Sequence, residues 1–238
     1  LARARQAINS DRTADARKLL EKFTQELPHD WEGQAMLGQI LSSEEDQSFL
    51  LWQRSLSSEA DSDSRIWLAR GLWLEKRGET KCAARCFREA FELEPELITA
   101  VSHLGQCIRL NGEPQIAELF SQRAKLLLRV RDLATRIDEQ QNLQWAPELV
   151  QCLESLGQFW EAWAWANVVS RSAPMDSSWK QQAQRLQRLV NKDLLRTDRT
   201  KLPARKLDWN QVPLPNWSEY SFEESTTIAQ ATKSSIRF

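Results

Sequence analysis

The stretch Ser64–Leu97, SRIWLARGLWLEKRGETKCAARCFREAFELEPEL, contains two amphipathic segments that are separated by a glycine. Apolar residues from Trp67 to Leu74 recur every three to four positions, as they do on one face of an α-helix. Gly78 supplies permissive backbone for a turn, and Pro95 ends the second segment because proline cannot continue helical hydrogen bonds. The stretch therefore predicts two antiparallel helices joined by a tight turn.

Glycine and alanine residues of the stretch Ser64–Leu97 recur at the same spacing in the residues that follow it. Units of a helical-repeat array bury their apolar faces only by stacking on neighbouring units. The repeat therefore predicts an all-α fold of stacked helix pairs. Four pairs of matching residues lie thirty-four positions apart: Gly71 and Gly105, Gly78 and Gly112, Ala83 and Ala117, and Ala90 and Ala124.

In the unit Ser64–Leu97, the tryptophan, glycine, alanine, aromatic and proline positions coincide with those of the tetratricopeptide repeat (TPR). The chain resembles this family. The resemblance covers roughly residues 3–175 and is clearest in the units 64–97 and 98–131. It implies a right-handed superhelix of stacked antiparallel helix pairs, about four to five units long. Such an array commonly ends in a capping helix that covers the last apolar face.

We accordingly expect three parts: a TPR-like array over 1–175, a capping helix over 176–199 and an extended tail over 200–238. Arg129 stands where the family usually has proline, so the second helix of the unit 98–131 is expected to run on, over about 113–140.

The tail holds KLPARKLDWNQVPLPNWS at positions 201–218, with three prolines and two tryptophans but no helical period. Two interpretations stay open. The tail is either a linker to a further domain, or an ordered arm in which Trp209 and Trp217 pack on the array.

The chain starts at Leu1 and ends on Ile236-Arg237-Phe238, which gives no natural stop. We expect a piece of a longer protein, such as the large bacterial multidomain proteins in which arrays of this kind precede a β-propeller. The cellular compartment stays open because a targeting signal could be missing. Four cysteines, too sparse for a disulfide framework, slightly favour the cytoplasm.

Charge and composition exclude several classes of function. The net charge is −1 and the isoelectric point is about 6.3, so bulk electrostatics give no attraction to nucleic acid or anionic membranes. No apolar run approaches the length of a membrane span. No phosphate-binding loop or catalytic signature is present, and Cys82 and Cys86 lack a second ligand pair for a metal. We expect neither enzymatic activity nor a cofactor.

The resemblance implies that ligand contacts come from the first helix of each unit, through a concave groove. The expected partner is a protein or peptide, bound as an extended or helical segment with acidic and apolar residues. The alternative is a structural arm, whose groove is occupied by its own tail, a downstream domain or a second copy. By register, the groove positions are Arg65, Leu68, Leu72, Lys76, Thr99, Ser102, Gln106, Arg109, Gln144 and Gln151.

A tryptophan cluster stands outside this pattern, at Trp160, Trp163 and Trp165. On a helix, Trp160 and Trp163 share a face and Trp165 points elsewhere. The cluster predicts either core packing between helices or an aromatic platform for a partner.

Overall fold

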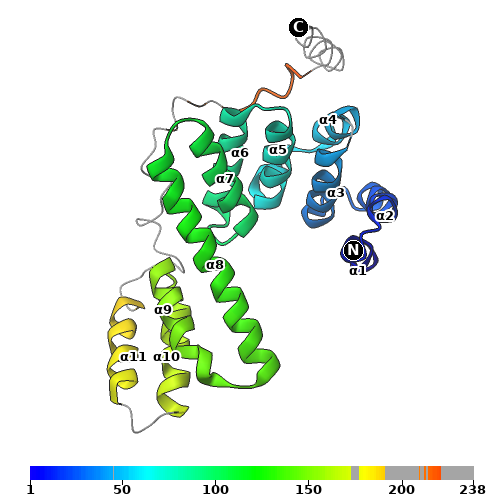
Figure 1. Ribbon diagram of the computed structural model, residues 1–238. Helices are drawn as coiled ribbons and strands as arrows, with labels where there is room; N and C mark the ends of the chain where they lie inside the picture. Colours follow the sequence, from blue (N-terminus) through cyan, green and yellow to red (C-terminus); the bar gives the residue numbers. More distant parts are fainter. Residues whose placement is uncertain (45, 173–176, 191–208, 210–211, 213, 221–238) are drawn as a thin grey trace, which may run out of the picture. The chain divides into compact units, whose positions relative to one another are not determined.

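The computed structural model describes residues 1–44, 46–172, 177–190, 209, 212 and 214–220 (Figure 1). Every regular element among these residues is a helix. The chain forms two compact units: unit 1 comprises Leu1–Asn111 with Trp209–Phe238, and unit 2 comprises Gly112–Asp208. Each unit is described separately.

Unit 1 is built from antiparallel helix pairs (Figure 1). Helix α1 packs on α2, α3 on α4 and α5 on α6, while α3 also packs on α5 and α7 on α5 and α6. This arrangement confirms the predicted all-α fold of stacked pairs. The bounds are α1 Ala2–Asn9, α2 Thr13–Glu26, α3 Trp31–Ser43, α4 Asp46–Ser55, a 3-10 helix Ser58–Ser62, α5 Ser64–Lys76, α6 Thr80–Leu93 and α7 Ile98–Leu110.

The two helices of a pair meet where a glycine faces an aromatic ring. A Cβ atom on Gly71 of α5 would lie 2.4 Å from Cε1 of Phe87 on α6. A Cβ atom on Gly38 of α3 would lie 2.3 Å from the indole of Trp52 on α4. No side chain fits at these distances, so each glycine lets a ring pack directly against the partner helix's backbone.

Turn chemistry sets the ends of the helices. Gly78 has a φ of +78°, a left-handed conformation that glycine adopts without steric cost. The Asp63 carboxylate caps α5 by accepting hydrogen bonds from the backbone N–H groups of Arg65 and Ile66. Asp30 caps α3 in the same way, through the N–H of Gly33.

In unit 2, α8 packs on α9, α9 on α10 and α10 on α11. The predicted long helix is present as α8, which covers Pro114–Gln140. The Arg129 guanidinium donates two hydrogen bonds of 2.7 Å to the Glu148 carboxylate, and these bonds lower the pKa of Glu148. The remaining bounds are a 3-10 helix Leu143–Trp145, α9 Ala146–Leu156, α10 Phe159–Ser172 and α11 Ser177–Val190.

Helix α11 lies within the predicted capping helix 176–199, and residues 176 and 191–199 of that prediction lie outside the described residues. Its Leu186 is fully buried in the core of unit 2, and Ala183 and Val190 are nearly so. The predicted continuous array is divided after Asn111, so that α7 and α8 of the unit 98–131 belong to different compact units.

No helix among the described residues has both the length and the apolar character needed to cross a membrane.

Replacing Gly71 by alanine is expected to lower the free energy of unfolding by about 1–3 kcal/mol, because the new methyl group would overlap the buried Phe87 ring. Urea unfolding followed by circular dichroism measures the change. The double variant Gly71→Ala, Phe87→Leu should recover part of the loss, since the smaller side chain removes the overlap. Equal stability of Gly71→Ala and the parent would contradict the assigned packing.

Candidate functional site

Unit 1 presents its first helices on one side, here called the first-helix face and defined by the predicted positions on α5 and α7. Glu75 fixes the register of the two helices. Its carboxylate lies 2.6 Å from His103 Nδ1 and accepts a hydrogen bond of 3.6 Å from Cys107 Sγ. The His103 ring also stacks on Phe87 with a centroid distance of 5.2 Å. These contacts hold α5 and α7 side by side.

The predicted groove residues of unit 1 are not equally accessible. Leu68 is only 3% exposed, whereas Arg65 and Leu72 are half-buried. The exposed members are Lys76, Thr99, Ser102, Gln106 and Arg109. The four on α7 follow one another at helical spacing, so they form one polar stripe.

The remaining predicted positions, Gln144 and Gln151, are exposed in unit 2. Gln144 lies in the short 3-10 helix before α9, and Gln151 lies within α9. They therefore belong to a different compact unit from the first-helix face.

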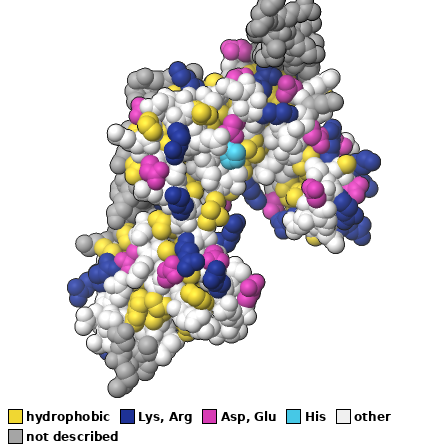
Figure 2. Space-filling view, in the orientation of Figure 1, with side chains coloured by type: hydrophobic (Ala, Val, Ile, Leu, Met, Phe, Trp, Pro, Cys, Tyr) yellow, Lys and Arg dark blue, Asp and Glu magenta, His cyan; other side chains and the backbone are white. Residues whose placement is uncertain are grey.

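Ion pairs run across the first helices. Glu32 of α3 forms ion pairs with Arg5 of α1 and, at 3.2 Å, with Arg65 of α5. The hydrogen bond from Arg5 lowers the pKa of Glu32. Lys76 donates to the backbone carbonyls of Ser43 and Glu44 at 3.1 and 2.6 Å, which links α5 to the end of α3. Figure 2 shows both acidic and basic side chains on the side of the molecule that it presents.

A second surface of unit 1, formed by α4, α5 and α6, binds the tail. Trp73 and Phe49 stack with centroids 5.0 Å apart, and the tail's Trp217 lies 6.1 Å from Trp73 and 6.4 Å from Phe49. Tyr220 makes an edge-on contact with Trp73 at 5.2 Å and donates a 2.5 Å hydrogen bond to Glu79. This set of contacts is the tail-docking site.

Arginines hold the rings and the backbone of the tail. The Arg70 guanidinium lies 4.4 Å from the Trp67 ring and 5.8 Å from the Trp217 ring. Arg77 lies in the same way between Trp73 and Tyr220, at 4.7 and 5.8 Å. Alternation of cations and aromatic faces is favourable, because each ring carries a negative quadrupole on its face.

The backbone carbonyls of the tail also find donors. Arg85 of α6 donates 3.0 Å hydrogen bonds to the carbonyls of Trp209 and Val212. Arg54 of α4 donates to the Tyr220 carbonyl at 3.0 Å. Trp209 itself is 8% exposed.

These contacts support the interpretation of the tail as an ordered arm for the described residues, with Trp209 and Trp217 as its anchors. The tail contacts given above fall on residues outside the predicted groove set. The sequence signal for this site is the pair Arg70 and Trp73 in an otherwise apolar stretch of helix. A buried arginine needs partners for its charge, and Arg70 is buried.

The cysteines show no reactive environment. Cys86 is fully buried and burial raises the pKa of its thiol; burial and then Glu75 raise the pKa of Cys107 to about 12. A protonated thiol is a poor nucleophile and a poor metal ligand. Among the described residues, no group of three His, Cys, Asp or Glu side chains is arranged to hold a metal ion.

The tryptophan cluster lies on α10 in unit 2. Trp163 and Trp165 pack against the hydrophobic core of this unit, in agreement with the core-packing interpretation. Trp160 remains 48% exposed and makes an edge-on contact with Trp163 at 5.4 Å.

No protein-family model matches the chain, and no curated protein matches it. Among solved structures, the chain is similar to the crystal structure of a thermophilic TPR protein from Thermus thermophilus, at 17% sequence identity and a TM-score of 0.42. The similarity covers 78% of this chain and 96% of that one. The stacked antiparallel helix pairs of this chain make its fold a TPR-like helical repeat.

Replacing Trp217 by alanine is expected to release the tail, because Trp217 contacts Phe49, Trp73 and Arg70 together. Limited proteolysis should cleave the tail at least several-fold faster, and the free energy of unfolding of unit 1 should fall by about 0.5–3 kcal/mol. Leu214→Ala is the matched control, since Leu214 is a tail residue that is 48% exposed. Equal cleavage of both variants would count against docking through Trp217.

Alkaline pH should also undock the tail. Burial, followed by the hydrogen bond to Glu79, raises the pKa of Tyr220 above the ordinary value of 10.0. The docked state favours the protonated phenol, so its contribution to stability is complete below pH 10.0 and is lost as the pH rises through the raised pKa.

Tyr220 is the single tyrosine of the chain, so ultraviolet titration of tyrosinate reports it alone. The parent should titrate above pH 10.0, and Trp217→Ala should titrate closer to that ordinary value. Titration of the parent at the ordinary value would show that the phenol is not docked.

Proposed function

We propose that this chain is a non-catalytic protein-interaction scaffold whose first-helix face binds an extended or helical segment of a partner protein. The observation that carries the proposal is the polar stripe Thr99, Ser102, Gln106 and Arg109 on α7, which Glu75 holds in register beside α5. The stripe stays exposed, while the tail takes up a different surface of the same unit.

The chemistry of this face favours a mixed partner segment. Leu72, one helical turn before Lys76 on α5, offers a half-buried apolar contact. The exposed side chains of Lys76 and Arg109 suit a segment with acidic residues around an apolar anchor, whereas Arg65 is paired with Glu32 and Asp63. These two carboxylates weaken the attraction of the face for the phosphate backbone of nucleic acid.

The tail-docking site favours a second candidate function, that of a structural arm within a larger protein. In sequence, unit 2 lies between the two parts of unit 1, and Trp209, Val212 and Tyr220 of the second part bind arginines of α4 and α6. As a structural arm, the chain would hold a downstream domain. In this case the first-helix face would have no separate partner.

The triple variant Lys76→Glu, Gln106→Glu, Arg109→Glu tests the scaffold proposal. Affinity capture from a lysate of the source organism, followed by titration of the captured partner, should show binding weakened at least tenfold, about 1.4 kcal/mol. The matched control is Lys18→Glu, Gln47→Glu, Lys81→Glu, which makes the same change in net charge at exposed residues on α2, α4 and α6. A partner that binds both variants equally, or no captured partner at all, would favour the structural arm.

A further inference from the structure

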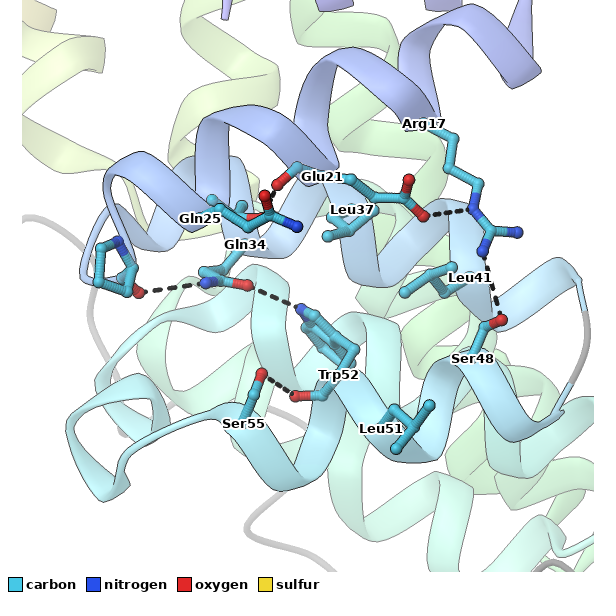
Figure 3. A pocket seen from close by; sticks show the side chains of 12 residues that line it. Arg17, Glu21, Gln25, Gln34, Leu37, Leu41, Ser48, Leu51, Trp52 and Ser55 are labelled. Carbon is cyan, nitrogen blue, oxygen red and sulfur yellow. Dashed lines mark hydrogen bonds and ion pairs between the residues drawn. The ribbon is translucent and has the colours of Figure 1, made fainter.

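A pocket lies between α2 and α4, over α3, on a part of unit 1 outside the first-helix face, and none of the described tail residues lines it. Its volume is about 460 Å³, within the range of about 300–1,000 Å³ typical of ligand sites. Figure 3 looks into it, with α2 above and α4 below, Arg17 at one end and Gln25 at the other. Leu37, Leu41 and Trp52 form its apolar floor.

The polar groups around this floor hold one another. Trp52 Nε1 donates to Gln34 Oε1 at 3.0 Å, and Gln34 Nε2 donates to the Pro28 carbonyl at 3.1 Å. At the other end, Arg17 donates to Glu21 at 2.7 Å and to Ser48 at 3.3 Å. The pocket is thus preformed, and Leu51 on its rim is 55% exposed to solvent.

The pocket on α2, α3 and α4 is the counterpart, one repeat earlier, of the tail-docking site on α4, α5 and α6. Gly38 and Gly71, which face equivalent aromatic rings, are 33 positions apart. The same offset relates Gln34, Leu37 and Leu41 to Trp67, Arg70 and Leu74. Arg70, stacked on Trp67, in turn contacts Trp217 of the tail. The match is closest at Leu37, the counterpart of Arg70, whereas Trp73 corresponds to Ile40, which does not line the pocket.

Helix α4 is the wall that the two sites share. Its Phe49 contacts Trp217, whereas its Leu51 and Trp52 line the pocket. Arg54, which binds the Tyr220 carbonyl, directly precedes Ser55 of the pocket lining. The pocket consequently continues the tail interface across α4.

We propose that this pocket binds an extended, proline-flanked segment of a partner protein that inserts one aromatic side chain onto Leu37, Leu41 and Trp52. The occupant of the corresponding site, the tail around Trp217, has this chemistry and is non-helical. Leu37 is the counterpart of Arg70. The inserted aromatic side chain of the partner would therefore make an apolar contact with Leu37, where Trp217 makes a cation–π contact with Arg70. This site is separate from the first-helix face and does not depend on the function proposed for it.

A labelled peptide with the sequence of residues 212–220, VPLPNWSEY, is the probe, titrated into the full chain by fluorescence anisotropy. We expect saturable binding that Leu51→Glu weakens at least tenfold, because a carboxylate on the rim opposes burial of an apolar anchor. Leu19→Glu is the matched control, an exposed leucine on α2 outside the pocket lining, and should bind like the parent. A peptide with alanine in place of its tryptophan should bind at least tenfold more weakly.

Three results would overturn the proposal. The first is the absence of saturable binding. The second is binding that Arg85→Ala alters and Leu51→Glu does not, which would show exchange with the chain's own tail at its docking site. The third is a concentration-dependent dimer of the full chain that Leu51→Glu abolishes, since the occupant would then be a second copy. The Lys76, Gln106 and Arg109 triple variant should bind the peptide normally, which separates this test from that of the first-helix face.

Discussion

The structure of unit 1 depends on the missing side chains of Gly38 and Gly71. Each lets an aromatic ring of the second helix rest on the backbone of the first, at a distance where a methyl group could not fit. Close packing of this kind fixes the rotation and the separation of the two helices in a pair. The pocket over α3 and the tail-docking site over α5 then follow one another in successive repeats.

Two surfaces of unit 1 consequently differ in character. The first-helix face is polar, is crossed by ion pairs such as Glu32–Arg65, and leaves the stripe on α7 exposed. The surface of α4, α5 and α6 is aromatic and binds the tail through rings and arginines. Exposed ion pairs contribute little to stability, whereas buried aromatic and cation–π contacts contribute more. The face proposed to bind a partner is therefore polar, whereas the surface that contacts the described tail residues is aromatic.

Because α7 and α8 belong to different units, a long segment of the chain connects the two parts of unit 1. The chain leaves unit 1 at Asn111, forms α8 to α11, and returns at Trp209. Closing so long an excursion costs conformational entropy that rises only slowly with length. The contacts of Trp209, Trp217 and Tyr220 with unit 1 offset that cost.

The sequence by itself determined the helix pairs, the long helix α8 and the helix at the capping position. These features follow from local causes: the period of apolar residues, a left-handed glycine at Gly78, and the absence of proline at Arg129. It also indicated that Trp209 and Trp217 were suited to packing. Only the tertiary structure decided where they pack, because the contacts of Trp217 with Phe49 and Trp73 join residues more than a hundred positions apart. The pocket between α2 and α4 could not be predicted from the sequence either, because it depends on the distance between these two helices. No local sequence pattern encodes that distance.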